Sequence, residues 1–475
     1  METINFSDSP TASAASMPRI TLLTMLRLGL LQLGLGMMSV LLFGLLNRVL
    51  IKELGVPATI ASVVLAVTLF VAPARIWFGQ LSDTRPLFGL HRTGYVLLGA
   101  ISFAVIAFVA VQVMWQVGAS LEASGWSGVT YAWTALLAVL FGLYGIAVGA
   151  CSTPFATLLV DVTDEEDRSK IVGVDWSMLI AGTIVGGITI GIMLRQLGTD
   201  PSLAQLQSSI NQLFVVVPLV VVGLALAATW GIEKKYSRYS LRSHIADPSQ
   251  EITLNRAWRI LTANRQTRFF FSFLIVMTMG LFLQDAVLEP YGGEVFKMPA
   301  GATATLNAFW GIGTLVGILG AGFWLAPRFG KRLTAQIGCQ SVVLSLVLVI
   351  LAGFSGNPRS LQLVLLIFGL ASGITTTGSV TLMLDLTAAE TAGTFIGAWG
   401  LAQALARGMA TVIGGATLDI GKQIATKLVL AYGFVFALQI LCMIVAISLL
   451  RRVNVQEFQM NAKEAIVAVI ASDRD

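Results

Sequence analysis

The sequence predicts an all-α membrane protein of about twelve transmembrane helices, arranged as two similar halves of six helices. Three observations predict this fold class. Of the 475 residues, 56% are hydrophobic and only 12% are charged, whereas about a quarter of the residues in an ordinary soluble domain are charged. Apolar runs long enough to cross a bilayer recur along the chain. One segment of the first half also recurs in the second half.

The predicted spans are apolar runs that reach the length of about 20 residues that a membrane-spanning helix needs. The first six lie at residues 22–46, 58–80, 93–118, 131–160, 171–195 and 211–231. The other six lie at residues 268–290, 303–325, 333–354, 361–384, 393–418 and 426–450.

These runs divide the chain into two halves with polar segments before, between and after them. The parts are a disordered tail at 1–18, the first half at 19–231, a linker at 232–267, the second half at 268–452 and a C-terminal tail at 453–475. In the linker, Asp247 and Pro248 favour a helix start, and apolar residues recur at helical spacing from Leu254 to Leu261. This pattern predicts either an interfacial helix on the cytoplasmic leaflet or a linker helix packed against the protein.

The distribution of basic residues predicts that both termini are cytoplasmic. With the termini on that side, most of the 30 Lys and Arg residues fall in cytoplasmic segments, as the positive-inside rule requires. These residues form no stripe with interleaved aromatic side chains, so we expect no binding of nucleic acid.

A weak internal repeat relates the two halves. Residues 145–173 resemble residues 369–397, with identical Gly, Asp, Thr and Glu residues at aligned positions. A parallel repeat of six spans is typical of the two-lobed transporters of the major facilitator superfamily. The loop GQLSDTRPLFGLHR at 79–92 resembles a loop of that superfamily, whereas its counterpart at 322–332 has Ala326 in place of the aspartate. The pattern predicts a major-facilitator-like fold and leaves the function open.

No enzyme signature is visible, so we expect a protein that is not an enzyme. The sequence has no phosphate-binding loop and no Gly-x-Ser-x-Gly nucleophile elbow. The acidic residues 164–167 are explained better by helix capping through Thr163 and Glu166 than by a metal site. The three cysteines lie far apart in separate apolar runs and indicate neither a disulfide framework nor a zinc site.

The two histidines, His91 and His244, fall in predicted loops. A haem-linked electron carrier or a permanent antenna protein is expected to place imidazole ligands within its spans. A magnesium tetrapyrrole held in this membrane protein would therefore need an oxygen ligand. Glycines four residues apart, such as Gly182 with Gly186 and Gly313 with Gly317, predict close helix packing, with a cleft for a flat ring as the alternative.

Some charged residues are predicted at membrane depth, where a charge is costly unless it is paired or faces a cavity. They are Arg75, Asp175, Asp285, Glu289 and Arg407. Counted from the cytoplasmic side, Arg407 and Asp285 lie at similar depths. We therefore predict that Arg407 pairs with Asp285 or Glu289. Arg75 and Asp175 lie nearer the cytoplasmic ends of their helices, where snorkelling or a structural ion pair is expected.

The stretch QDAVLEPYGGEVFKM at 284–298 resembles the characteristic segment of the PucC/LhaA family, a branch of the major facilitator superfamily associated with phototrophs. The stretches at 71–95, 302–317 and 392–408 are also similar to this family. The resemblance extends from about residue 19 to residue 452. Within the family, VPATI at 56–60 is closer to members from oxygenic phototrophs.

The resemblance implies a membrane assembly factor that binds or delivers chlorophyll to light-harvesting or photosystem apoproteins. It implies that chlorophyll a is the cargo or a transient ligand. It implies membrane lipid, the apoproteins and chlorophyll-synthesis enzymes as partners. The implied location is a thylakoid or photosynthetic inner membrane. The cofactor-binding residues that it suggests are Gln284, Asp285, Glu289, Tyr291, Gln403 and Arg407. In this hypothesis an oxygen of Gln284 or Glu289 ligates magnesium, and Arg407 compensates charge.

Two alternatives remain open at this point. Residues 289–293 could form a turn that ends a helix, because proline restricts the residue before it and glycines release the chain. The chain could also be a secondary transporter of a small solute or a tetrapyrrole. A polar, charge-lined central cavity would favour transport, and an apolar groove open to lipid near the seventh span would favour pigment handling.

Overall fold

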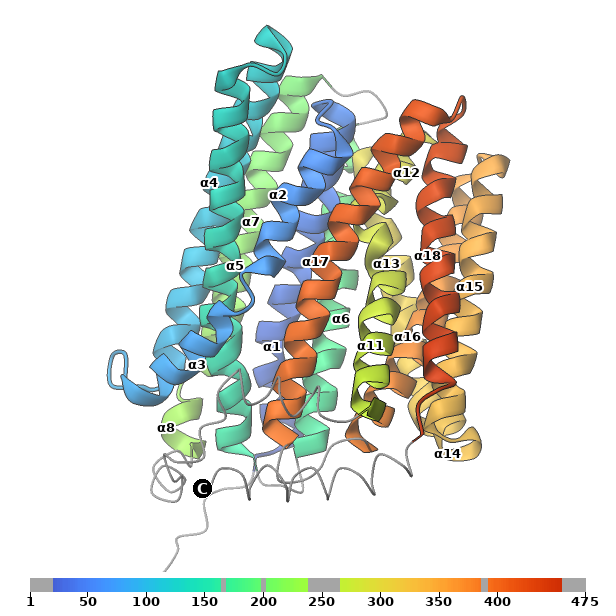
Figure 1. The fold of residues 1–475 in the computed structure, drawn as a ribbon. Coiled ribbons are helices and arrows are strands. Elements are labelled where there is room, and N and C mark those ends of the chain that lie inside the picture. Colours follow the sequence, from blue (N-terminus) through green and yellow to red (C-terminus); the bar gives the residue numbers. More distant parts are fainter. Residues whose placement is uncertain (1–19, 164–167, 198–201, 238–264, 386–391, 455–475) are drawn as a thin grey trace, which may run out of the picture.

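The computed structural model describes residues 20–163, 168–197, 202–237, 265–385 and 392–454. Within these ranges the chain is helical apart from short connections and one isolated bridge between Leu87 and Leu90. Figure 1 shows the long helices running side by side between two ends of a bundle. We call the end that carries α3, α8 and α14 the lower end, and the opposite end the upper end. The predicted N-terminal tail, residues 455–475 of the predicted C-terminal tail, the predicted linker helix and the capping residue Glu166 lie outside the described residues.

The first half begins with a helix that is longer than predicted, because α-helical and π-helical stretches follow one another as far as Glu53. Its elements are α1 (Leu22–Ser39), η1 (Val40–Leu46), η2 (Val49–Glu53), α2 (Ala58–Phe70), α3 (Ala74–Thr84), α4 (Thr93–Ser124), α5 (Gly128–Val162), α6 (Arg168–Met193), η4 (Arg195–Leu197), α7 (Leu203–Thr229) and α8 (Ile232–Tyr236).

The second half contains one helix that is interrupted at membrane depth, between α11 and α12. Its elements are α11 (Arg265–Phe282), η6 (Leu283–Ala286), α12 (Leu288–Glu294), α13 (Ala300–Gly320), η7 (Ala321–Leu325), α14 (Ala326–Phe329), α15 (Lys331–Ser355), α16 (Pro358–Asp385), α17 (Ala392–Ile424) and α18 (Leu428–Leu450).

The helices account for the twelve predicted spans. Within the described ranges, ten helical segments are long and apolar enough to cross a membrane. The segment formed by α2 and α3 supplies another span and bends at a turn that includes Pro73, which has no backbone N–H to continue the helix. The remaining span is α17, whose 33 residues extend over about 50 Å. The predicted all-α membrane fold is confirmed.

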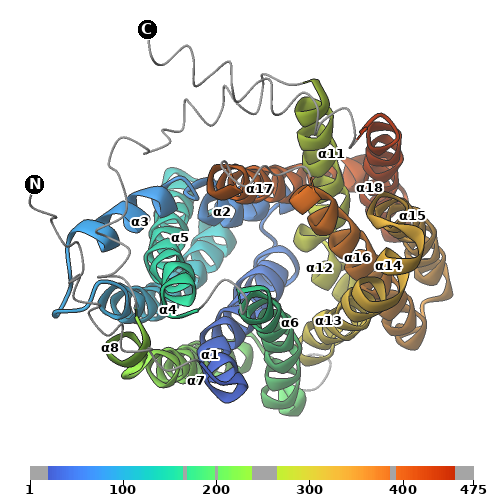
Figure 2. The same ribbon diagram turned by 90° about the horizontal axis from the view of Figure 1, so that it is seen from below.

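Two helix pairs join the halves. Helix α6 packs along α13, and α2 packs along α17; the view from below in Figure 2 shows both pairs. Under the internal repeat, α2 corresponds to α13 and α6 corresponds to α17. The two contacts are therefore related by the same pseudo-symmetry as the halves themselves.

Glycines allow several of these helices to approach closely. A Cβ atom at Gly182 of α6 would clash with the backbone oxygen of Leu33 in α1. A Cβ atom at Gly313 of α13 would clash with the backbone oxygen of Leu366 in α16. The close packing predicted from the glycine pairs is thus confirmed at these positions.

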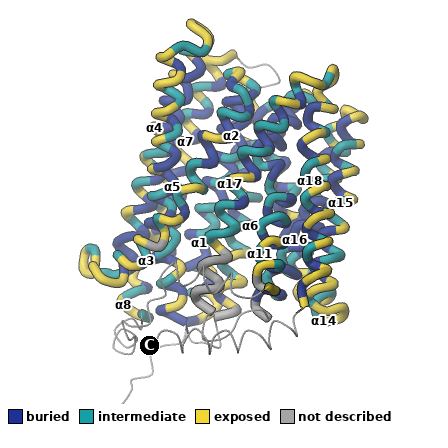
Figure 3. Tube along the Cα trace, viewed as in Figure 1, coloured by how far each residue is buried: buried dark blue, intermediate teal, exposed yellow. Residues whose placement is uncertain are grey.

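The surface of the bundle is apolar where it would face lipid. Figure 3 shows buried residues concentrated inside the bundle and exposed residues along its flanks and ends. Exposed side chains on the flanks include Leu98 and Val105 of α4 and Leu344 and Leu351 of α15. Such exposure is unfavourable in water and favourable in hydrocarbon, so the arrangement suits an integral membrane protein.

Candidate functional site: a polar cavity between the two halves

The seventh span is interrupted at the start of residues 284–298, the segment that resembles the PucC/LhaA family. Helix α11 ends at Phe282, a 3-10 turn follows at Leu283–Ala286, and α12 continues the span to Glu294. The side-chain amide of Asn47 donates a 2.7 Å hydrogen bond to the backbone oxygen of Ala286, so the first half satisfies one group that the interruption leaves free.

The predicted helix-ending turn at residues 289–293 is wrong. These residues lie within α12, and the break precedes them. Pro290 is tolerated because it stands in the first turn of α12, where a backbone N–H has no acceptor in the helix.

A small polar cavity lies beside this interruption, between the halves. Its volume is about 60 Å³, which is room for a few water molecules and far below the roughly 300–1,000 Å³ of small-molecule pockets. Ser39 and Thr183 of the first half line it together with Gln284, Glu289 and Arg407 of the second half. Apolar side chains, among them Phe43 and Phe282, line the rest of the wall, so the cavity is neither wholly polar nor an apolar groove.

An ion pair crosses the cavity wall between α17 and η6. Nε of Arg407 lies 2.8 Å from Oδ2 of Asp285, and Nη2 lies 2.6 Å from the same oxygen. The guanidinium also lies over the rings of Phe282 and Phe43, at 4.5 and 5.5 Å from their centroids. The pairing predicted for Arg407 is confirmed, and Asp285 is the partner.

Glu289 is more deeply buried and less completely paired. Its side chain is 2% exposed, and its Oε1 accepts a 2.7 Å hydrogen bond from the amide of Asn307 in α13. Its Oε2 is buried without a hydrogen-bond partner among the described residues. Gly44 makes room for this carboxyl, because a Cβ atom at that position would clash with Oε1.

Gln284 forms a buried amide pair with α18. Its Oε1 accepts a hydrogen bond from the side-chain amide of Gln439. Across the cavity, the indole Nε1 of Trp310 is buried without a partner in the described part of the chain. The cavity wall therefore holds both satisfied and unsatisfied polar groups.

Of the six residues suggested by the family resemblance, four line the cavity and two do not. Tyr291 is fully buried beside it: its hydroxyl donates a 3.0 Å hydrogen bond to the backbone oxygen of Val349, and its ring packs against Phe296, Tyr432 and Phe436. Gln403 is half-buried on α17, about one turn before Arg407, and is not part of the cavity wall that the described residues form.

The other two charges predicted at membrane depth lie apart from the cavity. Oδ2 of Asp175 accepts a 2.8 Å hydrogen bond from Gln32 of α1, and its Oδ1 is buried without a partner in the described ranges. Arg75 is exposed on α3, and its side-chain stem packs near Gly149 of α5. This exposure fits the snorkelling expected for Arg75.

Hydrogen bonds also join the halves at the upper end of the bundle. The carboxylate of Asp419 in α17 accepts hydrogen bonds from the backbone N–H groups of Ala58 and Thr59, at 3.0 and 2.7 Å, and from the Thr59 hydroxyl at 2.7 Å. Asp419 therefore caps the first turn of α2, which Pro57 cannot cap with its own side chain.

Arg48 forms a second contact between the halves. This side chain is 1% exposed, lies 3.0 Å from Oε1 of Glu53, and donates to the backbone oxygen of Met298 at 3.2 Å. Nearby within the second half, Lys422 pairs with Glu294 at 2.9 Å, and Tyr432 donates to the same carboxylate.

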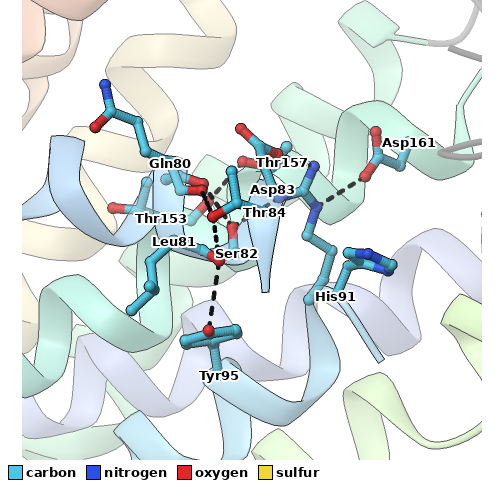
Figure 4. A network of polar contacts seen from close by, with 12 residues as sticks. Gln80, Leu81, Ser82, Asp83, Thr84, His91, Tyr95, Thr153, Thr157 and Asp161 are labelled. Carbon is cyan, nitrogen blue, oxygen red and sulfur yellow. Dashed lines mark hydrogen bonds and ion pairs between the residues drawn. The ribbon is translucent and has the colours of Figure 1, made fainter. Parts of the chain in front are cut away.

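A second charged network lies at the lower end, in the loop at 79–92 and around it. Figure 4 shows Ser82, Asp83 and Asp161, which Arg92 contacts. Its Nε lies 3.0 Å from Asp161, Nη1 lies 2.7 Å from the Ser82 hydroxyl, and Nη2 lies 2.5 Å from Asp83. Burial lowers the pKa of Arg92, but the hydrogen bond and charge of Asp161 together with the charge of Asp83 raise that pKa above its ordinary value.

Sequence reasoning missed Asn307, Arg48 and Asp419. Asn307 was visible as an amide inside an apolar run, a position where polar groups require partners. Arg48 lay just beyond the predicted end of the first span, and Asp419 lay just beyond the predicted end of the eleventh. Longer helices in the prediction would have placed both charges at membrane depth.

Comparison with known proteins gives the family. The family model described as PUCC protein matches residues 45–458. Protein PucC of Rhodobacter capsulatus is 30% identical over 92% of this chain and 94% of its own length. Protein PucC of Cereibacter sphaeroides is 30% identical over 93% of this chain and 95% of its own. The bacteriochlorophyll synthase 44.5 kDa chain of Rhodobacter capsulatus is 30% identical over 89% of this chain and 94% of its own length.

Solved structures of low sequence identity share the fold. The nucleoside transporter NupG has a TM-score of 0.63 and 13% identity, and the match covers 91% of this chain and 98% of that one. An inward-facing bacterial homologue of the human lysosomal transporter Spinster has a TM-score of 0.62 and 14% identity, and the match covers 93% of this chain and 98% of that one. The chain has a major-facilitator-like fold and belongs to the PucC family.

Proposed function

We propose that this chain is a membrane assembly factor that binds chlorophyll and delivers it to light-harvesting or photosystem apoproteins. Membership of the PucC family and the name of one relative, a bacteriochlorophyll synthase chain, support a link to this class of pigment. The proposed role involves no covalent chemistry. The structural observation that carries the proposal is a buried carboxylate oxygen without a partner among the described residues, Oε2 of Glu289, at the boundary between the halves.

Glu289 is the better of the two candidate magnesium ligands. Magnesium prefers oxygen ligands, and the two histidines of the chain fall in predicted loops. Oε1 of Gln284 already accepts a hydrogen bond from Gln439. Oε2 of Glu289 could bind magnesium without breaking a hydrogen bond that the structure shows.

The cavity has to open before it can hold a pigment, because about 60 Å³ is too small for a tetrapyrrole ring. In major-facilitator folds the two halves move against each other around a site at their interface. In our proposal this movement admits the ring, while the paired Arg407 and Asp285 remain a neutral unit beside it.

The test is pigment content after purification from a chlorophyll-making host in mild detergent. We expect stoichiometric chlorophyll on the wild-type protein and a loss of most of it in Glu289→Ala, with a smaller loss in Gln284→Ala. Glu122→Ala makes the same change at an exposed carboxyl near the upper end of α4 and serves as the matched control.

A colourless wild-type protein, together with unchanged antenna assembly in a deletion strain, would overturn the proposal. Equal pigment in wild type and Glu289→Ala would remove Glu289 as the ligand.

We further propose that the cargo is chlorophyll a, that the protein lies in a thylakoid or photosynthetic inner membrane with both termini cytoplasmic, and that the apoproteins and chlorophyll-synthesis enzymes are its partners. Chemical cross-linking in that membrane tests the partners.

A second candidate function is secondary transport of a small solute or a tetrapyrrole. The polar and charged wall of the cavity, contributed by both halves, favours it. Uptake of candidate solutes into vesicles that contain the pigment-free protein tests this alternative. Saturable uptake that Arg407→Ala abolishes would favour transport over pigment delivery.

A further inference from the structure

Helix α3 carries a groove at the lower end of the bundle, apart from the cavity between the halves. Its volume is about 490 Å³, and it is lined by Trp77, Gln80, Leu81, Thr84 and Arg85. We call it the α3 groove. The residues from Trp77 to Thr84 recur at i, i+3, i+4 and i+7, so they share one face of the helix.

The α3 groove faces the surroundings of the protein. Figure 2 shows α3 on the outer rim of the bundle, where it packs against α5. Trp77 is 58% exposed, and Gln80, Thr84 and Arg85 are exposed as well. Because α3 forms the lower part of a span, a molecule that fills this groove lies at the edge of the membrane.

The wall of the groove changes from apolar to polar along the helix. The chain runs down from α2 through α3 toward the lower end, and Trp77 precedes Arg85 by about 12 Å of helix. An indole ring with one polar N–H is favoured at the border between hydrocarbon and head groups. The polar side chains follow below it, in the order of a phospholipid from its acyl chains to its phosphate.

Arg85 brings a charge to the groove that is not paired within the described ranges. Its backbone is fixed, because its N–H donates to the backbone oxygen of Leu81 and its carbonyl accepts from the Tyr95 hydroxyl, both at 2.9 Å. Its guanidinium forms no hydrogen bond or ion pair with another described residue. The nearest carboxylate in the sequence, that of Asp83, pairs with Arg92 instead.

Two neutral side chains add hydrogen-bonding groups to the groove. The amide of Gln80 has no partner in the described part of the chain, so it can donate to a phosphate oxygen. The Thr84 hydroxyl donates to the backbone oxygen of Gln80 at 3.0 Å, which leaves its oxygen as an acceptor. A guanidinium binds phosphate with two parallel hydrogen bonds. The groove therefore offers donors to a phosphate and an acceptor to a neighbouring hydroxyl.

The equivalent loop of the second half binds its arginine differently. The guanidinium of Arg328 lies over the ring of Trp324, 5.9 Å from its centroid, and both side chains are exposed. Arg328 thus provides a matched control for Arg85, since the two residues share charge, exposure and position at the lower end.

We propose that the α3 groove is a binding site for one anionic phospholipid of the surrounding bilayer. Arg85 and Gln80 bind its phosphate, and the oxygen of Thr84 accepts a hydrogen bond from a head-group hydroxyl. The ring of Trp77 packs along the glycerol and the upper part of an acyl chain. The site is separate from the cavity between the halves, and it does not depend on pigment binding.

The first test titrates the purified full-length protein with phosphatidylglycerol or phosphatidylcholine and counts the bound lipids by native mass spectrometry. We expect one phosphatidylglycerol to bind about fivefold more tightly than phosphatidylcholine, which is the preference that one basic residue at the membrane surface gives. Arg85→Gln should abolish this preference, and Arg328→Gln should retain it. Equal binding of the two lipids to wild type, or the same loss in both variants, would overturn the proposal.

The second test locates the lipid on the wild-type protein, so it does not require a variant to fold. Phosphatidylglycerol with a photoreactive group near the top of one acyl chain is cross-linked to the protein, and the labelled peptide is identified. We expect the label on the peptide that contains Trp77, with no decrease in excess inorganic phosphate. Labelling confined to other helices would refute the site, and competition by inorganic phosphate would show a site for free anions in place of a lipid site.

Discussion

The network around Arg92 and the cavity around Glu289 are built from the same kinds of residues, but they differ in how completely their polar atoms are paired. Each guanidinium nitrogen of Arg92 has an oxygen within hydrogen-bond distance. In the cavity, Oε2 of Glu289 and Nε1 of Trp310 have no partner among the described residues. A complete network stabilises one arrangement, whereas an incomplete one leaves interactions for a ligand or another conformation to form.

The two halves also differ at equivalent loops. The first half retains Asp83, whereas the second has Ala326 at the corresponding position. Arg332 in that second loop is exposed, and it donates to the backbone oxygen of Arg451 at 2.6 Å. The ion pair of Arg92 with Asp83 therefore has no counterpart at position 326, where alanine cannot form one.

Removing the centre of the lower network should give the largest effect. Arg92→Ala leaves the buried carboxylate of Asp161 without its guanidinium partner, so we expect a loss of about 3–5 kcal/mol of stability. Arg332→Ala, at the equivalent loop of the other half, should cost less than about 0.5 kcal/mol. Thermal unfolding in detergent measures both, and similar losses would show that the two loops do not differ as the structure indicates.

The cavity ion pair should contribute less, because it is partly open to the cavity. We expect Arg407→Ala to cost about 2–3 kcal/mol, since it leaves Asp285 unpaired. In a double-mutant cycle with Asp285→Asn, the coupling energy should be about 1–3 kcal/mol. Additive losses would mean that the two side chains do not stabilise each other.

Loss of the cap on α2 should have a smaller effect. Asp419→Ala removes the acceptor for two backbone N–H groups, and we expect a loss of about 1–2 kcal/mol. Asp419→Asn keeps one side-chain oxygen and should lose less. Denaturation of both variants under the same conditions gives the comparison, and a larger loss in the asparagine variant would contradict the capping role.

Tyr291→Phe should have the smallest effect. The change removes one hydrogen bond to Val349 and keeps the ring in its aromatic packing, so we expect a loss of about 1 kcal/mol. Pigment content measured on the same preparation separates the two roles of this residue. A loss of pigment at unchanged stability would support the ligand role suggested by the family resemblance over the packing role that its contacts indicate.

The long-range pattern of the sequence predicts more of this molecule than its local motifs do. Hydrophobicity and the internal repeat predict twelve spans in two halves, because burial in lipid constrains every helix alike. Matching depths predict that Arg407 pairs with Asp285 or Glu289, because an unpaired charge there is costly.

Local motifs were less informative where the other half of the molecule decides the outcome. The segment at 289–293 reads as a turn, yet it is helical, and the interruption lies where Asn47 of the first half binds the backbone of Ala286. Gly44 likewise has no special signal in its own segment, and its importance comes from the carboxyl that packs against it. Such contacts between distant residues cannot be derived from the pattern of one segment.

The cap on α2 has a consequence for the order in which the protein is made. Ala58 and its capping residue Asp419 are 361 positions apart. At about 5–20 residues per second, a ribosome needs roughly 20–70 seconds to synthesise the intervening chain. During that interval α2 is already part of the nascent first half, but its first turn lacks the carboxylate that will cap it. The first turn of α2 in the newly inserted first half therefore stays uncapped until almost the whole second half has been translated.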